Sequence, residues 1–266
     1  MRRDELREKL APVRCFLLDM DGTVYLGGRL LPGALDFLRA ARESGRSALF
    51  LTNNSSKSAA NYVEKLRVLG IDVGPEAVLT SGQATAEFVR ARFPDARAFV
   101  LGTAALVKEL ADGGVDVDPD HPDLIIVGYD TTLDYAKMNR VCALAASGVP
   151  MIATHPDFVC PVEGGFAPDI GAILAFIEAA TGARPVDVVG KPNRHMLDTT
   201  ARRIGCAIEG MCMVGDRLYT DIAMGRHGIL TALVLSGETS AEMLAKSEYR
   251  PDIVAGGIGE LVEGLA

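Results

Sequence analysis

The sequence predicts an α/β fold in which a doubly wound parallel sheet core carries an inserted, smaller α/β domain. Short apolar runs rich in β-branched residues alternate with segments of helical apolar spacing along the whole chain. This alternation is typical of parallel sheets that are covered by helices on both faces. Polar motifs follow strands in the two outer parts of the chain, whereas the middle part has strands and helices without a comparable motif. We therefore expect the outer parts to form the core and the middle part to form the insertion.

Strands are predicted where the apolar runs are short, and helices where apolar residues recur every three or four positions. The predicted strands cover residues 14–20, 47–53, 98–102, 124–129, 150–154, 211–215 and 231–235. The predicted helices cover residues 34–44, 58–69, 85–93, 135–146, 170–180 and 196–204.

The core is expected to be discontinuous, with residues 1–80 and 183–266 on either side of an inserted domain at residues 81–182. An insertion of about 100 residues has the size of a small domain. Small residues and proline stand near both junctions, at residues 80–82 and 182–185, and suit hinge-like linkers.

The composition is that of a globular protein, and its charge disfavours nucleic acid and anionic membranes as main partners. Of its 266 residues, 48% are hydrophobic and 23% are charged. The formal net charge of -8 argues against nucleic acid or an anionic membrane as the main partner, because both would be repelled. The N-terminal segment lacks the apolar stretch of a secretory signal, and five scattered cysteines form no C-x-x-C pair. We therefore expect a cytoplasmic protein with reduced thiols.

Asp19 and Asp21 stand two residues apart where an apolar strand ends, so their side chains share a face. Two anions held this close repel each other unless a cation or a reaction intermediate needs both. One aspartate can attack phosphorus and become an aspartyl-phosphate, while a second carboxylate protonates the leaving oxygen. Gly22 frees the backbone to turn and to present amides to an anion. An isolated Asp-x-Asp-Gly is also a common solvated turn, so this motif alone leaves the choice open.

Two further motifs have groups suited to phosphate. Thr52, Asn53 and Asn54 gather hydroxyl and amide groups at the end of the second predicted strand, where they could bind phosphate oxygens or cap the next helix. Lys191 lies in a Gly-Lys-Pro motif after an apolar run. Its ammonium could balance the charge of a phosphate and of the two carboxylates, or it could be an ordinary surface lysine.

Asp216 and Asp221 form an acidic motif after another apolar run. Mg²⁺ takes oxygen ligands and prefers a few carboxylates together with water and substrate phosphate, so Asp216 is the natural further ligand. Asp221 could support that metal shell, stabilise a helix N-terminus, or do both.

Together, these motifs supply a nucleophile, an acid/base, anion donors, a counter-charge and metal ligands. All of them follow strands or precede helices, and ligands of doubly wound sheets bind at the carboxyl ends of the strands. The combination is a complete set for phosphoryl transfer. We therefore expect a Mg²⁺-dependent phosphatase of small phosphomonoesters.

The same motifs resemble the haloacid dehalogenase (HAD) superfamily and, more closely, its NagD / 4-nitrophenylphosphatase branch. The resemblance spans essentially the whole chain and rests on Asp19-Met20-Asp21-Gly22-Thr23 with Gly27, Thr52-Asn53-Asn54-Ser55, Gly190-Lys191-Pro192, and Gly215-Asp216-Arg217 with Thr220-Asp221. It implies a HAD-like Rossmannoid core with a large α/β cap (type II) inserted after the second motif.

The resemblance also implies a role for each site residue. The catalytic groups would be the nucleophile Asp19, the general acid/base Asp21, Thr52 and the charge-balancing Lys191. The phosphate-binding groups would come from Gly22, Thr52, Asn53, Asn54 and Lys191. Mg²⁺ would be held by Asp19, the backbone carbonyl of Asp21 and Asp216, and Asp221 would orient this shell.

In relatives the cap supplies a substrate-facing loop, which corresponds here to residues 153–157. Relatives often have Asn where this chain has His155, and this departure leaves the substrate preference open. His155 follows a predicted strand and could bind an anionic substrate, although a plain loop histidine is an equal alternative.

The expected partner is a small phosphorylated metabolite, such as a sugar phosphate, a nucleoside monophosphate, a phosphoglycolate-like acid or 4-nitrophenyl phosphate. Two alternatives are a phosphoaspartate-based signalling protein and a non-catalytic phosphometabolite-binding protein. Asp21 at the proton-transfer position and the large cap count against signalling. Relatives often dimerise, so a homodimer is compatible with the resemblance.

Overall fold

The computed structural model describes residues 2–162 and 165–265, which divide into two compact units. Unit 1 comprises Met1–Thr52, Val63–Leu79 and Leu197–Ala266, and unit 2 comprises Asn53–Tyr62 and Thr80–Met196. The chain therefore passes between the units four times, after residues 52, 62, 79 and 196. The expected boundaries of the insertion, residues 81 and 182, stay a prediction, and unit 2 also includes residues 53–62 and 183–196.

Unit 1 is built on a six-stranded sheet with the order β15-β14-β13-β1-β4-β5. Its strands are β1 (Cys15–Leu18), β4 (Ser47–Thr52), β5 (Val78–Thr80), β13 (Met211–Gly215), β14 (Leu230–Val234) and β15 (Ile253–Ala255). The pairs from β15 through β4 are parallel. All residues of β1 and β13 are buried, as expected for central strands covered on both faces. Their carboxyl ends lead directly into Asp19 and Asp216.

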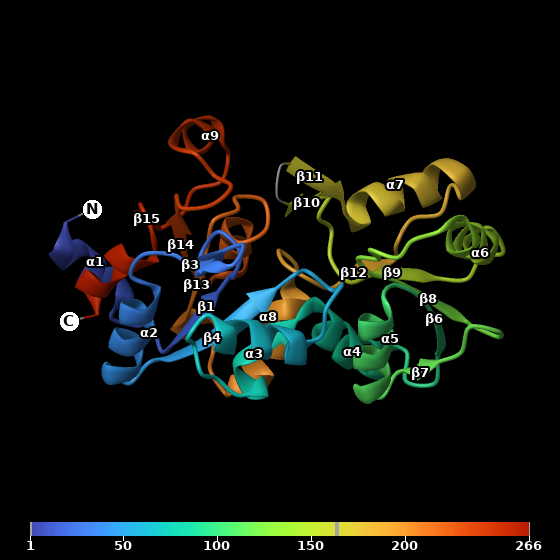
Figure 1. Ribbon diagram of the computed structural model, residues 1–266, viewed down its shortest axis with the longest axis horizontal. Helices are drawn as coiled ribbons and strands as arrows, with labels where there is room; N and C mark the ends of the chain where they lie inside the picture. Colours follow the sequence, from blue (N-terminus) through green and yellow to red (C-terminus); the bar gives the residue numbers. More distant parts are fainter. Residues whose placement is uncertain (1, 163–164, 266) are drawn as a thin grey trace. The chain divides into compact units, whose positions relative to one another are not determined.

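Most helices of unit 1 bury apolar residues, whereas α9 (Ala241–Lys246) and η1 (Pro75–Ala77) have no buried residue. The helices are α1 (Arg3–Leu10), α2 (Ala34–Glu43), most of α3 (Ala59–Val68) and α8 (Arg194–Ile204), α9, and the 3-10 helices η1, η2 (Ile208–Gly210), η3 (Ile222–His227) and η4 (Ile258–Gly264). Phe16 of β1 meets Phe37 of α2 edge to face, with ring centroids 5.0 Å apart. Figure 1 shows α1 beside the C-terminal end of the chain, where Leu6 leaves no room for a side chain at Gly264.

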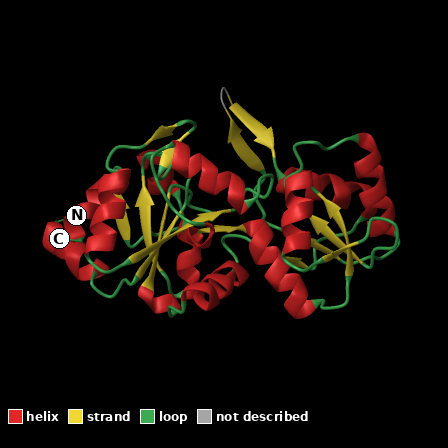
Figure 2. Cartoon of the chain, turned by 60° about the horizontal axis from the view of Figure 1, so that its bottom comes forward, coloured by secondary structure: helices red, strands yellow, loops and turns green. Residues whose placement is uncertain are grey.

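Unit 2 has its own parallel sheet, with the order β12-β9-β8-β6-β7. The strands are β6 (Arg97–Leu101), β7 (Asp116–Val117), β8 (Leu124–Val127), β9 (Met151–Ala153) and β12 (Asp187–Val188). The helices are α4 (Ser81–Arg92), α5 (Ala104–Asp112), α6 (Tyr135–Ala146) and α7 (Ile170–Thr181), and an antiparallel hairpin joins β10 (Val159–Val162) to β11 (Gly165–Pro168). Figure 2 shows helices around the strands of each unit.

Polar caps set the helix starts of unit 2. The hydroxyl of Thr80 accepts from the Gln83 N–H in a capping box at α4, and Asp169 accepts from the Ile170 N–H at α7. The small residues near the expected junctions also have roles at helix ends. Ser81 and Gly82 lie in the first turn of α4, and Gly182 ends α7 with a φ of 76°.

The predicted fold class is confirmed, since both main sheets are parallel and alternate with helices along the chain. Most of the predicted strands and helices are observed within a few residues of their expected ends. In the part of the chain that the structure describes, no helix is both long enough and apolar enough to span a bilayer.

Candidate active site

Three carboxylates meet in unit 1 at the carboxyl ends of β1 and β13. Asp19 follows β1, and its backbone N–H donates to the Val214 carbonyl at 2.9 Å. Asp216 follows β13, and Asp221 directly precedes η3. Each of these three aspartates offers a ligand atom within 4.8 Å of the other two. The parallel pairing of β1 and β13 therefore places the first and the last acidic motif of the sequence together.

The carboxylate of Asp216 is buried in a tight backbone cradle. It accepts hydrogen bonds from the Glu238 N–H at 2.7 Å and from the Thr23 hydroxyl at 3.3 Å. A Cβ atom added at Gly22 or Gly237 would lie only 2.4 or 2.0 Å from its Oδ2 atom. Burial, together with the negative charges of Asp19 and Asp221, raises the pKa of Asp216 to about 8, against the opposing hydrogen bond from Glu238 and the charge of Arg217.

Asp221 is fully buried and shapes the loop after β13. Its Oδ2 atom accepts a hydrogen bond from the Arg217 N–H at 3.1 Å. A Cβ atom at Gly215 would lie 2.3 Å from the Asp221 Cγ atom, so only glycine lets the strand end this close to the carboxylate. The contact fixes the turn that begins at Asp216.

The donor set fits a hard divalent cation. All three groups are carboxylates, which are the oxygen ligands that Mg²⁺ and Ca²⁺ prefer. Their mutual repulsion, seen in the raised pKa of Asp216, is the kind of strain that a bound cation relieves.

The side chain of Asp21 lies near a lysine. Gly22, with a φ of +92°, turns the chain so that its N–H donates to the Tyr25 carbonyl at 2.7 Å. The Nζ atom of Lys65, on α3, lies 3.8 Å from Asp21 Oδ2 and also 3.8 Å from the centroid of the Tyr25 ring. Partial burial raises the pKa of Asp21, and the charge of Lys65 opposes that rise. The protonated form of Asp21 is thus favoured relative to an ordinary aspartate.

In unit 2, the side chain of Asn53 forms two hydrogen bonds with the main chain of Lys191. Its Oδ1 atom accepts from the Lys191 N–H at 2.8 Å, and its Nδ2 atom donates to the Lys191 carbonyl at 2.9 Å. The remaining Nδ2 hydrogen goes to Asp157 Oδ1 at 3.1 Å. Because both amide hydrogens are used inside unit 2, any phosphate contact of Asn53 has to come from its backbone N–H.

In the same motif, the side chains of Asn54 and Ser55 accept hydrogen bonds from backbone N–H groups. Thr52 is the buried last residue of β4. The Asn54 Oδ1 atom accepts from the Ser56 N–H at 3.0 Å and from its hydroxyl at 2.6 Å, which is an Asx-turn. Ser55 is buried, and its hydroxyl accepts from the Tyr129 N–H at 2.9 Å. The side-chain oxygen of Asn54 therefore stabilises a turn.

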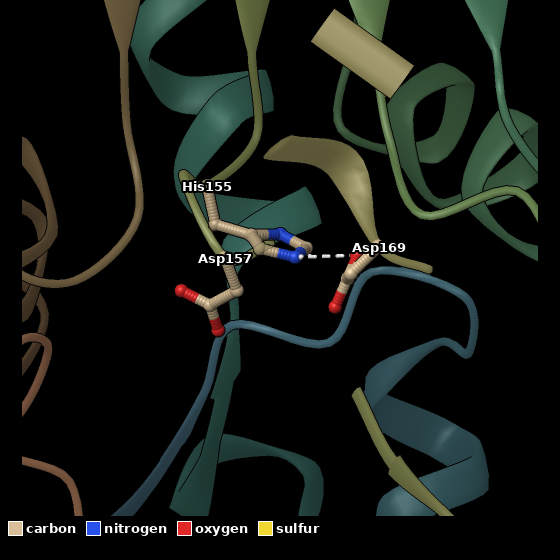
Figure 3. Close-up of side chains that lie close together, drawn as sticks. All are labelled: His155, Asp157 and Asp169. Carbon is tan, nitrogen blue, oxygen red and sulfur yellow. Dashed lines mark hydrogen bonds and ion pairs between the residues drawn. The ribbon is translucent and has the colours of Figure 1, made fainter. Parts of the chain in front are cut away.

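The sequence leaves His155 open as a substrate contact or a plain loop histidine, and the surroundings of its ring favour a role within the loop. Its side chain is fully buried, its Nδ1 atom lies 3.1 Å from Thr154 Oγ1, and its Nε2 atom lies 3.1 Å from Asp169 Oδ1. Figure 3 shows the ring directed toward Asp169, while Asp157 projects from the same loop. Both ring nitrogens therefore have protein partners, and His155 anchors the loop to the start of α7.

Comparison with known proteins decides the family. A family model described as haloacid dehalogenase-like hydrolase matches residues 16–116, and a second, HAD-hydrolase-like model matches residues 188–261. Dihydroxyacetone phosphatase of Corynebacterium glutamicum is 32% identical over 93% of this chain and 90% of its own length. The chain belongs to the haloacid dehalogenase-like hydrolase family.

Solved structures of HAD proteins place the chain more narrowly. The 4-nitrophenylphosphatase of Thermotoga maritima is 45% identical, with a TM-score of 0.95 over 97% of this chain and 99% of that chain. A glycerol phosphate phosphatase of Mycobacterium tuberculosis, solved in complex with calcium, is 31% identical, with a TM-score of 0.88 over 95% of this chain and 76% of that one. This protein is thus a HAD phosphatase of the NagD-like branch.

The structure brings together some of the HAD motif residues that the sequence predicts. Asp19, Asp216 and Asp221 meet within unit 1, and Asn53 meets the main chain of Lys191 within unit 2. Two contacts have no signal in the sequence. The pairing of Lys65 with Asp21 joins a helical surface position to a motif more than forty residues earlier. The contact of Asp157 with Asn53 joins the loop at residues 153–157 to the second motif.

Proposed function

We propose that this HAD phosphatase hydrolyses small phosphomonoesters in a Mg²⁺-dependent reaction that passes through an aspartyl-phosphate on Asp19. The observation that carries the proposal is the group of three carboxylates, Asp19, Asp216 and Asp221, at the ends of adjacent parallel strands. Such a site is electrostatically costly without a cation and a reaction that uses it.

The metal would be held by Asp19, the backbone carbonyl of Asp21 and Asp216, with Asp221 orienting the loop that carries Asp216. When bound, the cation offsets the negative charge of the carboxylates and of the incoming phosphate. The cradle of Gly22 and Gly237 around Asp216 supports this assignment, because it holds the carboxylate in one position.

The chemistry of the first step falls to Asp19 and Asp21. A carboxylate oxygen of Asp19 attacks the phosphorus atom, and the bond from phosphorus to the ester oxygen breaks. Asp21 donates its proton to the leaving oxygen. In the second step water attacks the phosphorus of the aspartyl-phosphate, Asp21 takes a proton from the water, and Asp19 is released with inorganic phosphate. The raised pKa of Asp21 supports its role as an acid.

The remaining motif residues are proposed to bind the phosphoryl group. Thr52 would donate its hydroxyl, and Gly22, Asn53 and Asn54 would donate backbone N–H groups. The charge-balancing role of Lys191 rests on the Gly-Lys-Pro motif. Of the two interpretations of His155, the loop histidine is proposed ahead of the substrate ligand, because its ring is buried and both ring nitrogens have protein partners.

The substrate is proposed to be a small phosphorylated metabolite, with phosphorylated sugars first, because one relative is named for dihydroxyacetone and another for glycerol phosphate. The 4-nitrophenylphosphatase similarity makes 4-nitrophenyl phosphate a suitable reporter. A cytoplasmic location and a homodimer are kept as expectations from the sequence.

The decisive experiment is the hydrolysis of 4-nitrophenyl phosphate with Mg²⁺ and after its chelation, by wild type and Asp19→Asn. We expect turnover that needs the metal and is lost in the variant. Asp36→Asn is the matched control, because Asp36 is an exposed aspartate of unit 1 that forms a surface ion pair with Arg39 on α2. Metal-independent turnover, or full activity of Asp19→Asn, would refute the mechanism.

A further inference from the structure

We propose that Asp157 is a positioning residue for the phosphatase reaction, because it orients the Asn53 carboxamide that holds the main chain of Lys191. This inference rests on the proposed function, in which Lys191 balances charge on the phosphoryl group. Asp157 belongs to the loop at residues 153–157, whose expected role of facing the substrate stays a prediction, and its contact with Asn53 gives the loop a positioning role as well.

The Asn53 carboxamide holds the main chain of Lys191 through two hydrogen bonds, and we call this contact the clamp. Oδ1 of Asn53 accepts from the Lys191 N–H at 2.8 Å, and Nδ2 donates to the Lys191 carbonyl at 2.9 Å. Asn53 is 5% exposed, Lys191 is 2% exposed and Asp157 is 3% exposed. Hydrogen bonds shielded from water to this degree are costly to lose, because the buried groups find no replacement partner.

Asp157 reinforces the orientation of the Asn53 carboxamide. An ionised carboxylate only accepts hydrogen bonds, so its Oδ1 atom, 3.1 Å away, requires the Nδ2 end of Asn53. If the amide turned over, its oxygen would face two acceptors, Asp157 Oδ1 and the Lys191 carbonyl. The carboxylate and the main chain of Lys191 therefore favour the same orientation, and removal of Asp157 leaves one buried N–H unsatisfied.

The loop that carries Asp157 is itself fixed to the Lys191 segment. The Val189 N–H donates to the Ala153 carbonyl at 3.0 Å, and the Gly190 N–H donates to the Thr154 carbonyl at 2.8 Å. A Cβ atom at Gly190 would lie 2.6 Å from Asn53 Oδ1 and 2.7 Å from the Thr154 carbonyl oxygen. The glycine of the Gly-Lys-Pro motif is thus required for the close approach of Asn53 and the loop.

At its other end the loop is anchored to α7. The Gly171 N–H donates to the Asp157 carbonyl at 2.8 Å, and His155 contacts Asp169, the cap of α7, as Figure 3 shows. Contacts that do not involve Asn53 therefore hold Asp157 in place. Its carboxylate can then accept the Asn53 hydrogen bond from one fixed position.

The kinetic consequence follows from where Lys191 acts. An ammonium that balances charge developing on the phosphoryl group contributes mainly to the transition state, so its displacement lowers kcat more than it raises KM. Misplacement by about 1 Å of a charge at a reacting centre costs on the order of 10²-fold. For Asp157→Ala we expect kcat to fall by about 10- to 100-fold, with KM changed by less than about threefold.

The test compares three variants with the wild type in 4-nitrophenyl phosphate hydrolysis at saturating Mg²⁺. Asp157→Asn keeps the size and one acceptor oxygen, so it should recover part of the lost kcat relative to Asp157→Ala. Asp130→Asn is the matched control, because Asp130 is equally buried in unit 2 and pairs with Lys137 at 2.6 Å. It should lower the melting temperature and leave kcat near the wild-type value.

Four outcomes decide the inference. A selective loss of kcat in Asp157→Ala, with partial recovery in Asp157→Asn, supports it. Wild-type kcat in folded Asp157→Ala overturns it, and so does an equal loss of kcat in Asp130→Asn. If the alanine variant does not fold, the folded asparagine variant decides, and an unchanged kcat there overturns the inference. Wild-type protein without metal-dependent turnover overturns the proposed function itself, which separates the two failures.

Discussion

Withdrawal of the divalent cation should make the stability of this protein fall as the pH rises. The reason is Asp216, whose pKa is raised to about 8 by burial and by the neighbouring charges of Asp19 and Asp221. In the unfolded chain the same carboxyl titrates near its ordinary value of 3.8. Between these two values the folded state binds more protons than the unfolded state, so the free energy of unfolding decreases with increasing pH. The ionisation of Asp216 is disfavoured by the fold.

The size of the effect has an upper limit set by proton linkage. One extra bound proton gives a slope of about 1.4 kcal/mol per pH unit, and the coupling of the three carboxylates spreads the titration and lowers the slope. Over the range from about pH 5 to about pH 7 we expect a loss of roughly 1–3 kcal/mol in the metal-free protein. A bound cation favours the ionised carboxylates, so added Mg²⁺ should stabilise the protein more at the higher pH.

Urea unfolding measured at a series of pH values, with either EDTA or saturating MgCl₂, checks this expectation. Asp216→Asn is the control, because an amide does not titrate and its curve in EDTA should be flatter than that of the wild type. A metal-free wild type whose stability rises with pH over this range would refute the reasoning. Stabilisation by Mg²⁺ that is greater at low pH would refute it as well.

Two further predictions concern Lys65 and His155. Lys65→Met removes the ammonium that holds the Asp21 carboxyl group in place from 3.8 Å, although the loss of its charge also raises the pKa of Asp21. The loss of positioning should lower kcat/KM by about two- to fivefold for an alkyl phosphate, whose leaving oxygen needs a proton from a well-placed acid, and less for 4-nitrophenyl phosphate. Lys65→Arg should restore activity, and equal losses for both esters would show that Lys65 does not act through Asp21. His155→Asn should lower the free energy of unfolding by about 1–3 kcal/mol, because it removes buried hydrogen bonds to Thr154 and Asp169. A profile over many phosphomonoesters should keep its ranking, and an altered ranking would restore His155 as a selector.

The proximity of Asp19 and Asp216 could be predicted from the sequence because each directly follows a strong strand signal. The apolar runs before Asp19 and Asp216 are short and fully buried, and parallel pairing brings their ends together. Short or less apolar elements escaped prediction, including β5, β12 and β15, which have only two or three residues each. The first turn of α4 was also missed, because Ser81 and Gly82 carry no apolar periodicity.

The contacts that adjust the motif residues could not be predicted, because they depend on tertiary packing. Lys65 occupies an ordinary helical position, and only the packing of α3 places it beside Asp21. His155 has the residue type of a ligand or a catalyst, and its polarity alone gave no sign of burial. Its role became visible only when Thr154 and Asp169 were found on either side of the ring.

The passage of the chain between its units has a consequence for protein engineering. Thr52 is the last residue of the first segment of unit 1, and Asn53 begins unit 2, which also contains Lys191. A chimaera that takes only residues 81–182 from a relative would combine a foreign Asp157 with the native Asn53 and Lys191. Transplants in which Asn53, Asp157 and Lys191 share one origin should keep their contacts intact, so recombination sites should be chosen after residues 52, 62, 79 and 196, where the chain passes between the units.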